Sequence, residues 1–215
     1  MVKSATSIIL FILASFAIGC ASSGRRHHAG DSAADFTIVM PQSELTVPND
    51  YAWKKQKFGE GSLQEAQLPK GGSLKLKRVE ATNLSAIVSE ADIHSLQVFA
   101  MELVSPSPLP KTDELLAAFA SQPFTQQGMT RLQEDRGSIN YGGARCSRVS
   151  GKVEVKGSEK FQNVPFDFQV TQLDCVHPKA DNRIIRLSIS ERARKGTPFV
   201  SDDLERDIAS TLQFK

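Results

Sequence analysis

The sequence predicts an α+β domain that is mostly antiparallel sheet, with a few short helices and a C-terminal helix packed on the sheet. From residue 36 onward, several segments alternate apolar with polar residues or form short apolar runs, which is typical of strands. Helical spacing appears in two segments, and strands do not alternate with helices as they do in a parallel α/β sheet. Residues 36–215 are long enough to form one domain with its own core.

The chain opens with an apolar run that is too short to span a membrane. The run covers residues 8–19 (IILFILASFAIG), whereas a transmembrane helix needs roughly 20 apolar residues. Lys3 precedes it and small residues end it, which is the layout of a secretory signal. The exit, Ala17-Ile18-Gly19-Cys20, resembles the lipobox of bacterial lipoproteins, although leucine is commoner where this chain has Ala17. An ordinary signal peptide with an incidental cysteine is the alternative.

The lipobox resemblance implies that Cys20 anchors the protein to a membrane. In that family the cysteine thiol receives a diacylglyceryl group and a peptidase cuts just before it, so residues 1–19 would be removed. Two or three acyl chains hold a protein on a bilayer far more firmly than one chain does. Residues 20–35 are small and polar after the cysteine, and we predict a flexible tether. Ala21 is not the aspartate that retains such lipoproteins in the inner membrane, so the family implies an outer membrane location facing the periplasm.

The first half of the domain contains three predicted strands. Residues 36–40 (FTIVM) alternate and stop at a proline, and residues 71–81 place leucines on one face and lysines on the other. Residues 95–104 are apolar on both faces, as in a central strand. Residues 105–110 (SPSPLP) contain too many prolines for a strand ladder, so a connector is predicted there.

Two helices are predicted, each from a capping residue followed by acids. Thr112 is expected to cap the first helix, which ends before Pro123. Ser201 is expected to cap the second, followed by the acidic pair Asp202–Asp203, which the helix dipole favours in a first turn. An apolar stripe then recurs every fourth residue, at Leu204, Ile208 and Leu212.

The remaining two cysteines lie in a predicted hairpin. Three further strands are predicted, at residues 143–156, 164–176 and 183–192. The first two form a hairpin that turns at residues 157–163, and if Cys146 faces Cys175, the apolar residues of both strands fall on one side. A slip of one residue would destroy this sorting, because side chains alternate with period two. Export leaves these cysteines in an oxidising compartment, so a disulfide is predicted; two free or buried thiols are the alternative.

The order of these elements resembles the PsbP-like fold, named for the extrinsic protein of the photosynthetic oxygen-evolving complex. Three pieces carry the resemblance: the opening FTIVMP, the turn INYGGARC that starts at Ile139, and the closing helix DDLERDIASTLQF. The tryptophan expected soon after the opening strand is absent, and Trp53 comes later. The resemblance implies one domain over residues 36–215, in a fold that hosts binding proteins more than catalysts.

The sequence contains no motif that identifies a catalytic or metal site. GEGSLQ at residues 59–64 lacks the third glycine of a dinucleotide loop, and neither GxSxG nor HExxH occurs. His94 and His177 are isolated in the sequence, and both are expected at the surface, at strand ends. The adjacent pair His27–His28 has no cysteine or acid cluster nearby. We therefore assign no catalytic residue, no metal and no cofactor.

Charge argues against nucleic-acid binding. The 26 basic and 24 acidic residues interleave and leave a formal net charge of +2. Glu134–Asp135 is expected in a turn. Basic residues recur along one hairpin strand, where they either form a solvated face or meet an acidic partner; they are Arg145, Arg148, Lys152 and Lys156.

The sequence thus predicts a membrane-anchored envelope lipoprotein whose domain is not an enzyme. The lipid anchor would bind the membrane, and the domain would bind an envelope protein or support an assembly. The alternative is an envelope hydrolase that acts on cell-wall or lipid material, because catalytic groups can converge from distant positions in a sequence.

Overall fold

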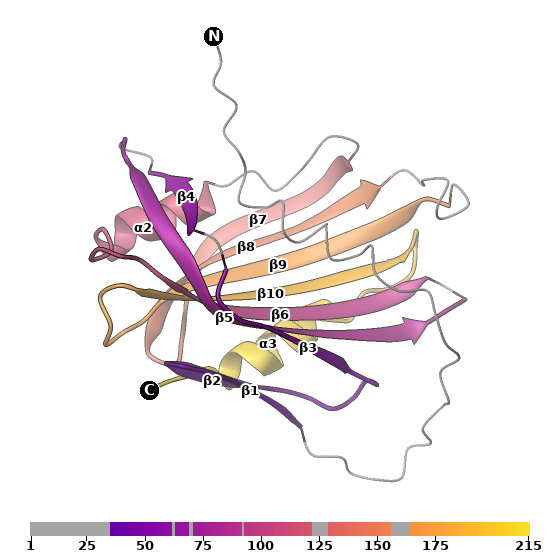
Figure 1. Cartoon of the computed structure of the whole chain (residues 1–215). Helices are drawn as coiled ribbons and strands as arrows, with labels where there is room; N and C mark the ends of the chain where they lie inside the picture. Colours follow the sequence, from indigo (N-terminus) through magenta and orange to yellow (C-terminus); the bar gives the residue numbers. More distant parts are fainter. Residues whose placement is uncertain (1–34, 62, 69–70, 92, 122–128, 156–163) are drawn as a thin grey trace.

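A computed structural model describes residues 35–61, 63–68, 71–91, 93–121, 129–155 and 164–215 (Figure 1). The signal peptide and tether predicted from the sequence lie outside these residues, and so does the predicted turn at residues 157–163. Neither described helix combines the length and apolar character that a membrane span requires.

The described residues form two antiparallel sheets and two helices, which confirms the predicted α+β class. The strands are β1 (Phe36–Met40), β2 (Ser43–Val47), β3 (Lys54–Phe58), β4 (Leu63–Gln67), β5 (Ser73–Ser89), β6 (His94–Val104), β7 (Met129–Tyr141), β8 (Ala144–Val155), β9 (Phe166–Val176), β10 (Arg183–Arg194) and β11 (Gln213–Phe214). The helices are α2 (Thr112–Ala120) and α3 (Ser201–Ser210).

The large sheet has the strand order β3-β5-β6-β10-β9-β8-β7, and β4 pairs with the first part of β5. A small sheet contains β1, β2 and β11 in the order β1-β2-β11. Long strands with alternating residues give the large sheet two distinct faces. Its core face carries Ile185, Leu187 and Ile189 of β10, and the opposite face, here called the α2 face, carries Arg186 and Ser188.

The main hydrophobic core lies between the core face and a layer made of β1, β2 and α3 (Figure 1). The predicted stripe of α3 is buried there, and each fully buried leucine or isoleucine contributes roughly 1.5–3 kcal/mol relative to exposure. The helix is not the last element, because β11 follows it and pairs with β2. On the α2 face, Leu115 and Phe119 of α2 pack against Leu103 and Ile184 of the sheet.

The register predicted for the hairpin of β8 and β9 is confirmed. Cys146 faces Cys175 and Val153 faces Phe168. The apolar pairs of this hairpin lie on the α2 face, whereas the cysteines lie on the core face and belong to the main core. On the core face, the hydroxyl of Thr171 donates a hydrogen bond to Ser150 Oγ at 2.9 Å, so this polar pair is satisfied across the hairpin.

Three predictions about local structure are wrong. Thr112 and Ser201 are the first residues of their helices and not the caps, and neither helix has a side-chain cap on its preceding residue. Glu134 and Asp135 lie within β7 and not in a turn, because β7 is an edge strand whose exposed positions accept charged residues. Burial would raise the pKa of Glu134, but hydrogen bonds from Arg131 and Arg136 outweigh it, and the pKa is lowered.

Candidate functional site

A cluster of polar side chains occupies the middle of the α2 face. We call it the polar cluster, and it comes from five strands: Asn83 (β5), Gln97 (β6), Ser147 (β8), Gln172 and Asp174 (β9), and Arg186, Ser188 and Ser190 (β10). Strand register brings them together, since Ser188 faces Gln172 on one side and Phe99 on the other, and Phe99 faces Asn83. The polar face of an antiparallel sheet is ordinarily solvated, whereas most residues of the polar cluster are buried, so this face is unusual.

Several atoms of the polar cluster are buried without a hydrogen-bond partner among the described residues. They are Asn83 Oδ1, Ser147 Oγ and Ser188 Oγ, and these residues are 9%, 2% and 3% exposed. Leaving a buried polar group unsatisfied costs roughly 1–3 kcal/mol. A folded protein that retains such groups in one place has hydrogen-bonding capacity available for water or a ligand.

The charges of the polar cluster neutralise each other. Arg186 Nε donates to Asp174 Oδ1 at 2.5 Å, and Gln172 Nε2 donates to Asp174 Oδ2 at 2.7 Å. The guanidinium carbon of Arg186 also lies 5.6 Å from the centre of the Phe119 ring on α2. Because the ion pair is satisfied internally, the groups left to meet a ligand are hydroxyls and an amide.

Apolar side chains flank the polar cluster on the same face. Val153, Phe168 and Val170 form a small buried group toward β8 and β9. Toward the opposite edge, the rings of Phe58 and Phe99 meet edge-on, with centroids 6.3 Å apart. A face with neutral polar groups between apolar ones suits a molecule that has both polar and apolar parts.

His94 and His177 are both buried, so the prediction that they lie at the surface is wrong. The Nε2 atom of His94 contacts the carboxylate of Glu191, and both side chains are almost fully buried. The Nε2 atom of His177 lies 3.2 Å from the carbonyl oxygen of Gln42, and its ring meets Phe214 edge-on. Residues that are distant in the sequence cover these strand ends, so the local sequence pattern does not predict that the two histidines are buried.

Glu191 caps the start of α3, whereas the sequence predicted that Ser201 would be the cap. Its Oε2 accepts hydrogen bonds from the backbone N–H groups of Val200 at 2.9 Å and Ser201 at 2.8 Å. These are donors that a helix start otherwise leaves unpaired. The His94–Glu191 pair therefore has a structural role, because it joins β6, β10 and α3.

His94, Glu191 and Ser201 are the described residues that come nearest to the arrangement of a serine hydrolase. A serine, a histidine and a carboxylate lie close together at His94, Glu191 and Ser201. However, Ser201 Oγ makes no hydrogen bond with a described residue and is buried. A nucleophilic serine needs a hydrogen bond to its base, and Ser201 Oγ makes none with His94 or with any other described residue.

The basic residues along β8 meet acids of the same chain. Arg148 makes two hydrogen bonds with Glu205 of α3, at 2.7 and 2.9 Å, and these bonds raise the pKa of Arg148. Lys152 pairs with Asp167 at 3.2 Å. Arg145 pairs with Asp113, and Lys156 lies outside the described residues. Of the two interpretations of this strand, the acidic partner applies, and that partner is intramolecular.

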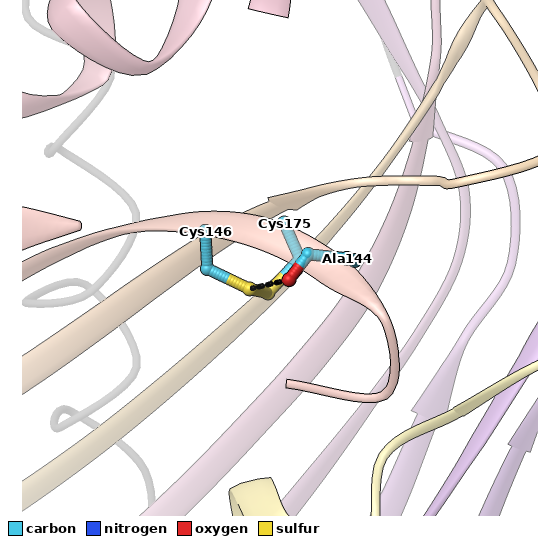
Figure 2. The surroundings of a disulfide bond; sticks show 3 residues. All are labelled: Ala144, Cys146 and Cys175. Atoms are coloured by element: carbon cyan, nitrogen blue, oxygen red, sulfur yellow. Dashed lines mark hydrogen bonds between the residues drawn. A yellow bond between two sulfur atoms is a disulfide. The ribbon is translucent and has the colours of Figure 1, made fainter. Parts of the chain in front are cut away.

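The structure joins Cys146 and Cys175 by a disulfide between neighbouring strands (Figure 2). Their Cα atoms are 4.0 Å apart, and Sγ of Cys146 lies 3.8 Å from the carbonyl oxygen of Ala144. Cys20 lies outside the described residues. Among the residues that are described, no three histidine, cysteine or acidic side chains gather in a way that could hold a metal ion.

Comparison with known proteins identifies no family for this chain. No family model matches it, and no curated protein sequence does. A similar solved structure is that of LpqN, described as involved in cell envelope biogenesis of Mycobacterium tuberculosis. The two chains are 10% identical, the match covers 77% of this chain and 93% of LpqN, and the TM-score is 0.40. No conclusion about function follows from a similarity at this level.

Proposed function

We propose that this protein is a lipoprotein of the bacterial cell envelope, anchored by acyl chains on Cys20. The observation that carries the proposal is the sequence Ala17-Ile18-Gly19-Cys20 at the end of an apolar run too short to span a bilayer. Residues 1–19 are the signal peptide and residues 20–35 the tether. By the family rule for Ala21, the anchor lies in the outer membrane and the domain faces the periplasm.

The domain itself binds a ligand or an envelope protein and is not an enzyme. The polar cluster supports this role, because buried hydroxyl and amide oxygens that have no hydrogen-bond partner in the described part of the chain are gathered on one face, between apolar side chains. The arrangement of His94, Glu191 and Ser201 gives no support to the hydrolase alternative, since Ser201 Oγ makes no hydrogen bond with His94 or with any other described residue. The PsbP-like fold belongs to the same proposal, and the opening strand, the INYGGARC turn that starts at Ile139 between β7 and β8, and the closing helix support it.

The anchor is tested by replacing the cysteine. Cys20→Ala is expected to abolish acylation, so that the protein leaves the detergent phase in a phase-partition experiment. Ser22→Ala, a change two residues away, is the control and should behave as the wild type. Mass spectrometry of the wild-type amino terminus should find an acylated Cys20. An unmodified amino terminus at any other residue would contradict the proposal.

The binding role is tested at the polar cluster. Protein purified from its native membrane is expected to carry a bound molecule that mass spectrometry detects. Ser188→Leu places a branched apolar side chain among the unpaired oxygens and is expected to reduce the bound molecule at least tenfold, the effect of roughly 1.4 kcal/mol. Ser210→Leu changes an exposed serine on α3 and is the control. Equal amounts bound to the wild type and Ser188→Leu would place the binding elsewhere.

A further inference from the structure

Apolar side chains form a continuous strip on the α2 face, beside the polar cluster. The strip comes from β8 and β9 and contains Val149, Val153, Val155, Phe166, Phe168 and Val170. Three of its members form a hydrophobic cluster that is separate from the cluster under α2. The two strands lie about 5 Å apart, and the strip follows them for about 13 Å from Val170 to Phe166. This apolar strip therefore has the width of a single hydrocarbon chain.

Strand pairing places the apolar strip next to oxygens that lack partners. One row across the sheet contains Asn83, Phe99, Ser188, Gln172 and Val149. In this row, Asn83 Oδ1 and Ser188 Oγ have no described hydrogen-bond partner, and they lie two strands or about 10 Å apart. In the next row, Ser190 and Gln97 hydrogen-bond to each other. The groups left for a ligand are thus an acceptor at Asn83 and a hydroxyl at Ser188, beside the start of the strip.

The central strands of these two rows carry no charged side chain in the described part of the chain. The charges of the rows lie on the edge strands β3 and β7, at Lys54, Glu134 and Arg136, and the last two pair with each other. On one side of the rows, Arg186 pairs with Asp174. On the other side, Arg192 lies over the ring of Phe166, four residues or about 13 Å along β10 from Ser188.

This distribution of charge favours an uncharged ligand. An ionised group beside Ser188 would be buried without a counter-ion, which is strongly unfavourable. A hydroxyl satisfies both free groups, because it can donate to Asn83 Oδ1 and can donate to or accept from Ser188 Oγ. A head group with several hydroxyls can bridge the two, since a hydrogen bond at each end covers about 3 Å of the gap.

The burial of the site indicates a small molecule and not the surface of another protein. Ser188, Val153 and Val170 are almost fully buried, so a folded partner that lies on the domain would not touch them. A narrow molecule reaches such groups by entering the fold, and ligand sites are typically apolar with a few placed polar groups. Of the two binding partners in the proposed function, the site therefore favours the ligand over the envelope protein.

We propose that the α2 face binds one uncharged lipid whose head group carries hydroxyls. The head group hydrogen-bonds to Asn83 and Ser188, and one acyl chain lies along the apolar strip. The proposal rests on the proposed function, because the anchor at Cys20 holds the domain at a bilayer that supplies lipids. Ser147 Oγ lies one row away and on β8, about 12 Å from Ser188, and is not part of this site.

Photo-crosslinking tests this site in the complete acylated protein. The protein is reconstituted into phosphatidylcholine vesicles that contain a monoacylglycerol with a diazirine group in its acyl chain. After illumination and digestion, mass spectrometry should find the crosslinks on residues 149–155 and 166–170. A second probe has the same chain but a phosphate in place of the glycerol head group. It should give at least tenfold less crosslinked protein, because its charge finds no counter-ion.

The variant Ser188→Ala separates binding from folding. It removes a hydroxyl that is buried without a described partner, so thermal unfolding should occur at the same temperature as in the wild type or higher. Crosslinking of the glycerol probe should fall about fivefold, the effect of one hydrogen bond. Ser43→Ala is the matched control, because Ser43 Oγ is buried in the same way but lies on β2, in the other layer. It should leave crosslinking unchanged.

The apolar strip is tested by Val170→Thr, which keeps the shape of the side chain and adds a hydroxyl. An acyl chain over this position would leave the hydroxyl unpaired, so crosslinking of the glycerol probe should fall at least fivefold. Val88→Thr makes the same change at an exposed position on β5 and should have no effect.

Three results would each overturn the proposal: crosslinks of the glycerol probe outside the strip, equal crosslinking by the two probes, or full crosslinking of Ser188→Ala. The proposed function is contradicted separately, if protein from the native membrane carries no bound molecule or if Cys20 is not acylated. A charged molecule that co-purifies with the wild type and is lost in Ser188→Leu would keep the binding role and refute the uncharged lipid.

Discussion

Gly142 shows how a single residue can be required for two different reasons. It lies with Gly143 in the turn between β7 and β8, and both have positive φ, 55° and 80°. A two-residue hairpin turn favours glycine at such positions. At Gly142, a Cβ atom would also lie 2.3 Å from the carbonyl oxygen of Leu212, whereas at Gly143 it would meet nothing within 4 Å.

Comparing the two glycines separates backbone strain from steric clash. Gly143→Ala is expected to lower the free energy of unfolding by about 1–2 kcal/mol, the cost of a left-handed alanine. Gly142→Ala should cost more, because the backbone at Leu212 must also move. Urea unfolding of the purified variants measures both values. Equal losses would show that the approach of Leu212 contributes nothing.

The sequence predicts the turn at Gly142 and Gly143, but it does not predict the close approach of the Leu212 carbonyl oxygen to Gly142. The letters NYGGA between apolar residues indicate a hairpin, since paired glycines are typical of such turns. Leu212 is seventy positions away, and only the folded chain brings it to Gly142. The burial of His94 and His177 escapes the sequence for the same reason.

At the scale of elements, α3 begins where a buried carboxylate from another strand meets it. Glu191 accepts from the first N–H groups of the helix and contacts His94 at the same time. The sequence shows a serine followed by two acids, which predicts a local cap at Ser201. The cap instead comes from Glu191, ten residues earlier than Ser201, because its buried carboxylate lies against the first N–H groups of α3.

Removing this carboxylate is expected to loosen the start of α3. Glu191→Ala should lower the free energy of unfolding by about 3–5 kcal/mol, because it leaves a buried partner and two N–H groups unpaired. Glu191→Gln keeps an acceptor oxygen and should cost less. Amide hydrogen exchange at Val200 and Ser201 should accelerate in Glu191→Ala.

An exposed acid on the same helix provides the control for Glu191. Asp203→Asn removes a first-turn acid that pairs with exposed Arg206, so a loss of a few tenths of a kcal/mol is expected. If exchange at Val200 and Ser201 were the same in Glu191→Ala and the wild type, the carboxylate would not be the cap.

Strands differ in how well the sequence predicts them. The segment of β10 alternates, with Ile185, Leu187 and Ile189 on one face, and the predicted strand over residues 183–192 agrees closely with its bounds. β3 has the sequence KKQKF and is exposed along most of its length, so it carries no apolar alternation. Most of β7 is polar for the same reason. Both lie at edges of the large sheet, where charged residues protect unpaired backbone groups from other chains.

At the scale of the whole molecule, the disulfide links two strands through the main core. Cys146 and Cys175 are 29 positions apart and both are buried. Replacing both, Cys146→Ala with Cys175→Ala, is expected to lower the free energy of unfolding by roughly 3–4 kcal/mol, since the unfolded chain loses a closed loop. Urea unfolding under oxidising conditions measures the difference.

Thiol counting decides whether the bond exists in the protein as purified. The unfolded and unreduced wild type should show no reactive thiol apart from an unacylated Cys20. Reduction should lower the stability of the wild type toward that of the double variant and should leave the double variant unchanged. Two free thiols in the oxidised wild type would contradict the disulfide.

The sequence does not predict the polar cluster, because its residues come together only when the strands pair into the sheet. Its residues come from β5, β6, β8, β9 and β10, so the cluster cannot be recognised from any two of these strands. Within one strand, Arg186, Ser188 and Ser190 look like a solvated face. They become a buried group only when pairing places Gln172, Phe99 and Asn83 beside them.

The small sheet of β1, β2 and β11 has a consequence for how the chain folds during synthesis. β11 pairs with β2, and Ile38 and Leu45 share one core with Leu204 and Ile208. The layer that β1 and β2 form over the core face is therefore complete only when residues 204–214 are available. A chain emerging from the ribosome therefore cannot complete its main core until its last residues have been made, and under the proposed function this delay keeps it unfolded for export.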